Sequence, residues 1–444
     1  MPIPDTPFFQ SHYMPNTPSQ QQEMLDAIGI SSVDDLFSDI PKKHRHPTLD
    51  IPHPMSEIDL KHELMTLGTQ NSNLEQNACF LGAGAYNHFS PSIVKPILTR
   101  GEFLTSYTPY QAEASQGTLQ VAYEFQSLVS NLMGMDVAND GMYDGATSFA
   151  EAALMACRVT KRDEIYVLDT ISPEYREVIE TYALPQNLKV HSLPSSNPSL
   201  PVSAACLLVQ YPNFFGNIDD LSLYKRQTEA VGALLTVSAD PVAMGMLKPP
   251  GEFGADIVTG EGQGLGVPIS YGGPYVGLFC TRKKFIRQMP GRIVGRTNDS
   301  DGKTGYVLTL QTREQHIRRE RATSNICTSQ ALLALAATIT MAALGKTGFR
   351  QLSELSYHKA HYAASLIETI PGFSLPVHGD FFNEFVVKCP ISPSEINRHL
   401  LTKGIIGGLD ISSSIPNCML IAVTEMNTAP QITALVETLS EFGS

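Results

Sequence analysis

The sequence lacks three features that would place the protein in a membrane, in a secretion pathway or on nucleic acid. It has no run of eighteen or more apolar residues, and residues 1–10 have neither the basic start nor the apolar centre of a secretion signal. It also has no long basic run, and its net charge is −13. These absences argue against a membrane or nucleic acid as the main partner and predict a cytoplasmic protein.

Paired cysteines are also lacking. The seven cysteines are scattered singly, with no Cys-x-x-Cys spacing and no nearby pair of histidines. Most stand in apolar surroundings, so we expect buried reduced thiols rather than disulfides or metal ligands. No metal site is predicted.

The most informative absence is that of lysine from the glycine-rich stretch Gly254 to Pro274, which contains seven glycines in twenty-one residues. A short buried strand is expected at 256–259, and another begins at Tyr275 directly after Gly272-Gly273-Pro274. Between these strands the glycines allow positive φ angles and a close approach of other groups to the backbone. A plain mobile loop is the alternative interpretation.

Two neighbouring segments give the stretch a chemical meaning. The apolar strand 233–239 ends in Asp240, where open α/β sheets place residues that contact ligands. Upstream, the turn of Gly145, Ala146, Thr147 and Ser148 precedes a helix at 149–158, and helix N-termini of this kind can hold a phosphate. A phosphate turn, a strand-end Asp and a loop that offers a lysine form the layout of large pyridoxal-phosphate (PLP) enzymes of the aspartate aminotransferase type.

The nearest lysines do not fit that layout. Lys248 precedes the strand at 256–259, and Lys283 and Lys284 follow the strand at 275–281, so each would need a different connection to reach the same point.

Five separated motifs resemble the N-terminal half of the glycine cleavage system P-protein, over nearly the whole chain. They are Gly82–Asn87, Tyr107–Gly117, Gly262–Pro268 with Tyr271–Pro274, Met289–Arg292, and Gln311–Arg319 continuing into Ala322–Thr328. In this family the other half carries a His-Lys pair where this chain has Gly262-Gln263. The resemblance therefore implies that Gln263 stands at the Schiff-base position and that PLP is bound by a partner subunit. It further implies decarboxylation of glycine, transfer of the aminomethyl group to the lipoyl group (lipoamide) of the H-protein, and an α2β2 assembly.

The alternation of strands and helices predicts the fold class: an α/β, fold type I large domain with a mostly parallel sheet, followed by a small α+β domain. Expected strands are 164–168, 204–210, 234–239, 256–259 and 275–281; expected helices include 119–132, 149–158, 174–182 and 223–231. We divide the chain into an N-terminal arm at 1–75, a large domain at 76–325 and a small domain at 326–444. Helices at 20–28 and 33–39 and a linker at 41–54 are expected in the arm, which either clasps a neighbouring subunit or packs on its own domain.

Gly82–Asn87 fails as a dinucleotide fingerprint because no clear strand-loop-helix unit follows it, so we expect a tight turn near the active centre. In the motif Tyr107–Glu113, the residues Thr108, Tyr110, Gln111 and Glu113 are either a structural corner or contributors to the partner's active site. The resemblance favours the second interpretation.

The basic segment 311–321 has two open interpretations. Pairs of Glu314 with Arg318 and of His316 with Glu320 would fit the charged face of an ordinary helix. Alternatively, the segment receives a carboxylate or the acidic surface of a carrier protein. We expect a loop at 292–301 and a buried helix bridging the domains at 331–344, a run too short to span a bilayer.

Two competing functions remain open: a self-sufficient PLP enzyme that uses another lysine, and a structural pseudo-enzyme that supports a catalytic subunit. Under the main hypothesis Asp240 and the 145–148 turn are remnants of a second cofactor site.

Overall fold

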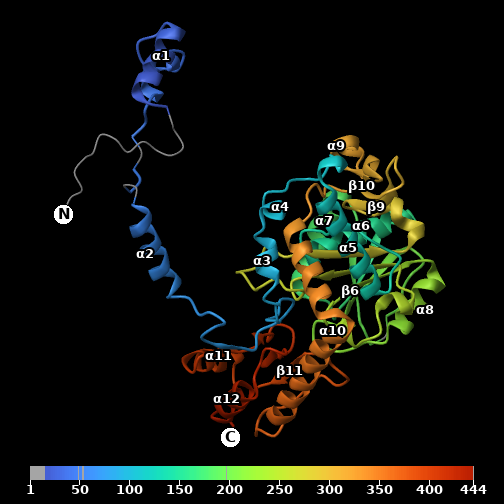
Figure 1. Ribbon diagram of the computed structural model, residues 1–444. Coiled ribbons are helices and arrows are strands. Elements are labelled where there is room, and N and C mark those ends of the chain that lie inside the picture. Colours follow the sequence, from blue (N-terminus) through green and yellow to red (C-terminus); the bar gives the residue numbers. More distant parts are fainter. Residues whose placement is uncertain (1–15, 49, 53–54, 197, 444) are drawn as a thin grey trace. The chain divides into compact units, whose positions relative to one another are not determined.

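The computed structural model describes residues 16–48, 50–52, 55–196 and 198–443. The chain divides into two compact units, residues 1–71 and residues 72–444 (Figure 1). Each unit is described separately below. The sequence-based division at residues 75 and 325 stays a prediction.

The N-terminal unit contains α1 (Pro18–Ile28), two 3-10 turns, η1 (Val33–Phe37) and η2 (Lys42–His44), and α2 (Glu57–Gly68). α1 begins at a capping box in which the Thr17 side chain accepts from Gln20 N, and it ends at Gly29, whose φ is 83°. The expected helix at 33–39 is a 3-10 turn, and α2 was not predicted. None of these four elements contains a buried residue.

The larger unit is built on a seven-stranded sheet with the strand order β2-β8-β7-β6-β5-β3-β4. Five neighbouring strands run parallel, whereas β8 is antiparallel to β7 and β2 is antiparallel to β8. The strands are β2 (Val137–Ala138), β3 (Glu164–Leu168), β4 (Lys189–Leu193), β5 (Ala204–Tyr211), β6 (Leu234–Ala239), β7 (Ile257–Glu261) and β8 (Gly277–Thr281). The predicted mostly parallel sheet is confirmed.

Helices cover both faces of this sheet, which explains why its central strands read as continuous apolar runs (Figure 1). Alternate residues of β5 enter different cores. Leu207 and Val209 pack with Phe125 of α5 (Gln116–Met133), while Cys206 and Leu208 pack with α6 (Gly145–Thr160). Two further helices of this region are α7 (Pro173–Ala183) and α8 (Leu221–Val231).

Two segments differ from the sequence-based expectation. The loop expected at 292–301 is wrong, because β9 (Ile293–Asn298) pairs with β10 (Thr304–Thr309) as an antiparallel hairpin. Val294 of β9 is buried against Leu119 and Ala122 of α5. This contact could not be predicted from the charged residues of the segment 292–301. The missed strand β4 is an edge strand with polar and partly exposed residues, so it lacks the apolar run of its neighbours.

The C-terminal part of the larger unit holds the antiparallel sheet β11-β14-β13 and the helices α11 (Pro393–Thr402) and α12 (Ala429–Ser440). Its strands are β11 (Glu384–Lys388), β13 (Leu409–Asp410) and β14 (Cys418–Ala422). Residues from far upstream join this part, because β1 (Ala78–Cys79) pairs with β12 (Ile405–Ile406). The small α+β fold is confirmed.

One long helix, α10 (Ala331–Ile367), contributes to both halves of the larger unit. Ala334, Ala337 and Met341 lie in the core beneath the large sheet, whereas Ala360 and Ile367 lie in the core of the small sheet. Gly345, with φ 59° and ψ −177°, interrupts the helix between them. The expected bridging helix at 331–344 is therefore only the first part of α10.

By length and composition, α10 is also the one helix in the described part of the chain that could cross a membrane, with a mean hydropathy of 1.5 over its most apolar window. Such a helix is weak evidence for a membrane span. Its buried residues belong to two packed cores, which is typical of a core helix.

Candidate functional site

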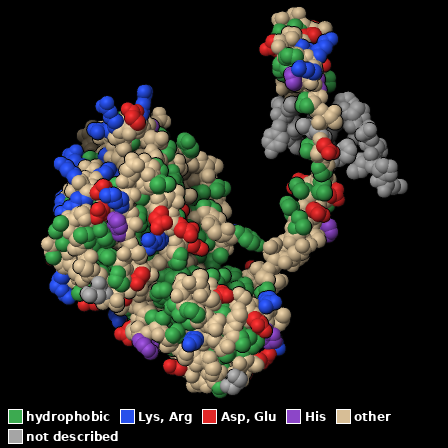
Figure 2. Space-filling view, turned by 180° about the vertical axis from the view of Figure 1, so that it is seen from behind, with side chains coloured by type: hydrophobic (Ala, Val, Ile, Leu, Met, Phe, Trp, Pro, Cys, Tyr) green, Lys and Arg blue, Asp and Glu red, His purple; other side chains and the backbone are tan. Residues whose placement is uncertain are grey.

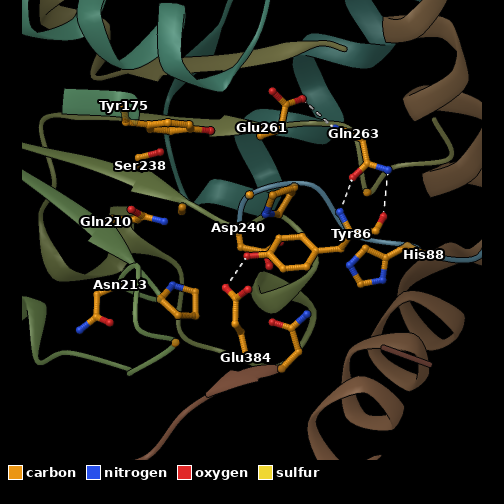
Figure 3. Close-up of a pocket in the computed structure, with 17 residues that line it drawn as sticks. Tyr86, His88, Tyr175, Gln210, Asn213, Ser238, Asp240, Glu261, Gln263 and Glu384 are labelled. Carbon is orange, nitrogen blue, oxygen red and sulfur yellow. Dashed lines mark hydrogen bonds between the residues drawn. The ribbon is translucent and has the colours of Figure 1, made fainter. Parts of the chain in front are cut away.

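A polar cavity opens at the carboxyl ends of β5, β6 and β7, where open α/β sheets place their ligands (Figure 3). It measures about 580 Å³, part of which is open to solvent. Two predicted residues, Asp240 after β6 and Gln263 after β7, line it together. Among the described residues that line it, none is Lys or Arg. The lining also includes Tyr86, His88, Tyr175, Gln210, Asn213, Ser238, Glu261, Asn383 and Glu384.

Asp240 is held at the end of β6 by the backbone. Its amide N donates to the Tyr211 carbonyl at 3.0 Å, and its Oδ1 accepts from Val242 N at 2.8 Å. Burial raises the pKa of Asp240, and the nearby His88 opposes that increase. The predicted strand-end carboxylate is therefore present in the cavity.

The predicted phosphate turn is a helix N-terminus, but α6 begins at Gly145 rather than at Phe149. Carboxyl groups of the chain itself accept the hydrogen bonds of the backbone amides at this helix N-terminus. Gly145 N donates to Glu261 Oε2 at 2.8 Å, and Thr147 N donates to Asp144 Oδ1 at 2.7 Å. The Ser148 hydroxyl donates to the Asp144 carbonyl, and Ala146 lies between these residues in the first turn.

Glu261 is the residue that the sequence-based analysis missed at this end of the cavity. Its second oxygen, Oε1, accepts from Gln263 N at 3.0 Å. Burial raises the pKa of Glu261 to about 8, and the neighbouring Asp144 adds to the increase while the amide donors oppose it. The carboxyl is thus fixed by two backbone donors between α6 and the glycine-rich stretch.

The side chain of Gln263 links two backbone segments by hydrogen bonds. Its Oε1 accepts from Tyr86 N at 2.8 Å, and its Nε2 donates to the Tyr86 carbonyl at 2.9 Å and to the Val267 carbonyl at 2.8 Å. The residue is 2% exposed. All of its hydrogen-bonding groups therefore join the glycine-rich stretch to the segment at 86.

The glycine-rich stretch divides into a buried part and an exposed part. Residues 262–267 lie inside the protein, whereas 268–274 are largely exposed and Tyr271 is 92% exposed. The mobile-loop interpretation does not describe the buried part, because Gln263 ties it to the neighbouring segment.

The segment Gly82–Asn87 forms a tight turn, as expected, and brings Tyr86 into the cavity (Figure 3). Tyr86 Oη donates to Glu384 Oε2 at 2.9 Å, and Ala83 N donates to Glu384 Oε1 at 2.7 Å. Burial raises the pKa of Glu384 to about 7. A glycine is required at 82, because a Cβ there would lie 2.5 Å from Ala422 Cβ.

A buried ion pair closes another side of the cavity. His88 Nδ1 lies 2.9 Å from Glu425 Oε2, and their side chains are 2% and 7% exposed. Burial lowers the pKa of His88, but the charge and hydrogen bond of Glu425 and the charge of Asp240 together outweigh burial, and the net pKa is raised. Burial likewise raises the pKa of Glu425, but the charge and hydrogen bond of His88, together with the hydrogen bonds from Phe89 N and Ser356, outweigh burial, and the net pKa is lowered.

The three lysines considered earlier stay outside this cavity. Lys248 Nζ lies 4.3 Å from the centre of the Phe253 ring, and Lys284 Nζ lies 3.7 Å from Asp256 Oδ1. Lys283 begins the 3-10 turn after β8 and is exposed.

The motif Tyr107–Glu113 lies elsewhere, on the surface between α4 (Gly101–Leu104) and α5. Tyr110 is 47% exposed, Gln111 and Glu113 are exposed, and Thr108 is partly buried. None of these four residues lines the Asp240 cavity.

Tyr110 contacts two residues of the other family motifs. Its ring centre lies 5.3 Å from that of His316 and 5.6 Å from the Arg292 guanidinium. Thr108 and Arg292 line a second cavity with Asp140, whose pKa burial raises to about 7. The motifs that are separated in sequence thus meet on one surface.

The basic segment beyond β10 is not one helix. It forms η8 (Gln311–Arg313), α9 (Gln315–Arg318) and η9 (Arg319–Arg321), with Arg319 at φ 53°. The ordinary helix of the first interpretation is not formed, because the break at Arg319 separates His316 from Glu320, and His316 instead lies 3.4 Å from Glu314. Residues 282–321 contain eleven Lys and Arg against four Asp and Glu, and blue side chains gather over β9, β10 and α9 in Figure 2.

Comparison with known proteins gives this arrangement a family. A sequence model described as "Glycine cleavage system P-protein" matches residues 11–439. The chain belongs to the P-protein family.

Within the P-protein family, the chain is 50% identical over 443 residues to a protein of Thermomicrobium roseum, covering 97% of this chain and 99% of that one. That protein is named "Probable glycine dehydrogenase (decarboxylating) subunit 1". A solved P-protein, glycine decarboxylase of the glycine cleavage system in inhibitor-bound form, superposes with a TM-score of 0.92 at 40% identity, over 97% of this chain and 99% of that one.

A more distant structure shows the fold alone. A C-DES mutant with glycine covalently linked to its PLP cofactor gives a TM-score of 0.60 at 15% identity, over 83% of this chain and 98% of that one. The expected fold class, the PLP-dependent fold type I, is confirmed.

Proposed function

We propose that the chain is the subunit of glycine dehydrogenase (decarboxylating) that does not carry PLP. Together with subunit 2, it decarboxylates glycine and transfers the remaining aminomethyl group to the lipoyl group of the H-protein. The proposed assembly is an α2β2 heterotetramer in the cytoplasm. Neither a membrane nor nucleic acid is proposed as a partner. The name and the coverage of the Thermomicrobium roseum relative support the subunit assignment.

The main support for the cofactor assignment is the hydrogen bonding of the Gln263 side chain. An amide nitrogen is not a nucleophile towards an aldehyde, and this one is bound to two carbonyl oxygens. The remaining lining residues do not fit a phosphorylated cofactor either, because no Lys or Arg is among the described lining residues and the Glu261 carboxyl accepts the hydrogen bond of Gly145 N. We therefore place the PLP on subunit 2.

PLP, when bound, supplies an electron sink for the charge left after loss of carbon dioxide. The proposed contribution of this chain is a set of side chains at the edge of the partner's site. Thr108, Tyr110, Gln111 and Glu113 lie on a loop carried by the rigid α5 end, where they are accessible to a second chain. The basic residues of 311–321 are proposed to receive an acidic surface of the H-protein.

Reconstitution tests the proposed function. This chain and subunit 2 are each purified alone and then mixed, and carbon dioxide release from glycine is measured with a lipoyl H-protein as acceptor. We expect release from the mixture and none from this chain alone. Unaided decarboxylation by this chain, with an aldehyde cofactor attached to one of its lysines, would establish the self-sufficient enzyme instead.

Variants of the exposed motif separate a shared site from a scaffold. Tyr110→Ala and Glu113→Gln are expected to lower kcat at least about tenfold in the mixed enzyme, because each removes a polar group proposed to face the partner's site. The controls are Tyr362→Ala and Glu124→Gln, which change an exposed tyrosine and an exposed glutamate on other helices.

Assembly of all four variants is followed by size-exclusion chromatography. Normal assembly with lost turnover for Tyr110→Ala and Glu113→Gln supports the shared site. Unchanged turnover would leave the scaffold as the function of this chain.

A further inference from the structure

We propose that the carboxyl of Glu261 is a built-in occupant of the phosphate-binding end of the Asp240 cavity. It takes the place of a phosphate group at the N-terminus of α6, so that the chain folds with this end of the cavity closed. Removal of the side chain is expected to open an anion site for inorganic phosphate or a phosphate ester.

The contacts of Glu261 resemble those of a bound oxyanion. Its two oxygens accept from two backbone N–H groups, Gly145 N at 2.8 Å and Gln263 N at 3.0 Å. Gly145 is the first residue of a sixteen-residue helix, whose unpaired amides and dipole favour a negative group. Figure 3 shows the carboxyl of Glu261 directed away from the ring of Tyr86 at the upper edge of the cavity.

The space around the Gly145 amide is already filled. A Cβ built on Gly145 would lie 2.4 Å from Tyr175 Oη and 2.9 Å from Glu261 Cβ. Tyr175 is itself a lining residue of the cavity. A tetrahedral anion could therefore reach this amide only if the Glu261 side chain moved away.

The charge of the cavity explains why a carboxyl suits this place better than a phosphate. Asp240, Glu261 and Glu384 all line the cavity, and burial raises the pKa of each. His88 lines the same cavity, but its Nδ1 is paired with Glu425. In the wild type a phosphate would add its charge to that of three acidic groups, whereas Glu261 is able to take up a proton. Glu261→Ala removes one of the three acidic groups and frees the Gly145 amide for an anion.

This inference rests on the proposed function only in treating the cavity as a former cofactor site. The test uses the full chain alone and needs no turnover. Melting temperatures of the wild type and of Glu261→Ala are measured in sodium phosphate at about 50 mM and in sodium chloride of equal ionic strength. Phosphate binding is measured separately by equilibrium dialysis.

We expect Glu261→Ala to melt several degrees higher in phosphate than in chloride, and to bind about one phosphate per chain, because a ligand that binds the folded state stabilises it. The wild type should melt at the same temperature in both salts. Glu261→Gln is the matched control, since its side chain keeps the volume and still blocks Gly145 N.

Glu261→Asp covers the case in which Glu261→Ala does not fold. Its shorter side chain withdraws from Gly145 N, so it should bind phosphate more weakly than the alanine variant but more tightly than the wild type. Equal response of wild type and variants to phosphate would overturn the proposal. So would stoichiometric phosphate on the wild type. Failure of the proposed function would appear instead as glycine turnover by this chain alone.

Discussion

Glu384→Gln is expected to raise the melting temperature at pH 8 while leaving it nearly unchanged at pH 5. Burial raises the pKa of Glu384 to about 7 in the folded chain, against an ordinary value of 4.5. Between these two values the unfolded chain releases the proton while the folded chain keeps it. The contribution of Glu384 to stability is therefore fully present below about pH 4.5 and is lost as the pH rises through about 7.

The size of the loss follows from the size of the shift. It corresponds to about 3 kcal/mol of unfolding free energy between pH 5 and pH 8, an order-of-magnitude figure. A glutamine keeps the acceptor for Ala83 N and can donate to Tyr86 Oη, but it does not titrate. Chemical unfolding of wild type and variant at several pH values measures the difference.

The matched control for this experiment is Glu354→Gln. Glu354 pairs with Arg350 on the surface of α10, where a charged pair contributes little to stability. Its effect on stability should not vary between pH 6 and pH 8. Parallel pH profiles for the wild type and Glu384→Gln would show that the carboxyl is ionised throughout.

Glu425→Ala is expected to reduce the unfolding free energy by about 3–5 kcal/mol, because it leaves the buried His88 without its charge partner. It also removes the acceptor for Phe89 N and for the Ser356 hydroxyl. These contacts connect the segment that follows the Gly82–Asn87 turn to α10. Loss of that connection loosens the side of the cavity that His88 closes.

Glu425→Gln separates the charge from the hydrogen bonds, because the amide keeps one acceptor oxygen. We expect it to lose less stability than Glu425→Ala. In the His88–Glu425 ion pair the pKa of His88 is raised and that of Glu425 is lowered. The pair therefore stabilises the fold most between about pH 4.5 and 6.5, which are the ordinary pKa values of the two groups. Its contribution to stability falls as the pH rises through the folded pKa of His88. A loss below 1 kcal/mol for Glu425→Ala at pH 6 would contradict the ion pair.

Much of the large sheet can be predicted from the sequence, because β5 and β6 are buried on both faces and therefore consist of continuous apolar runs. The sequence also places Asp240 and Gln263, since both directly follow such strands. The edge strand β4 and the hairpin of β9 and β10 escape the same reasoning. Their residues are half polar, and the residues that bury Val294 of the hairpin, Leu119 and Ala122 of α5, lie far away in the sequence.

The remaining residues of the cavity could not be found from spacing. Glu384 is 298 positions from Tyr86, and Glu425 is 337 positions from His88, so only the fold brings each pair together. Glu261 is different. It stands two residues before Gln263 in the printed sequence, so a carboxylate inside the glycine-rich stretch was a signal available from the sequence.

The long helix α10 places a constraint on how this chain can change over time. Buried residues of α10 up to Leu352 fill the interior below the large sheet, and buried residues from Ala360 onwards fill the interior of the small one. Each residue added to a helix turns everything after it by about 100°. A single inserted residue between Met341 and Ala360 would swing the second set of side chains towards water, so lineages of this protein should vary there by exchanging residues and keep the spacing constant.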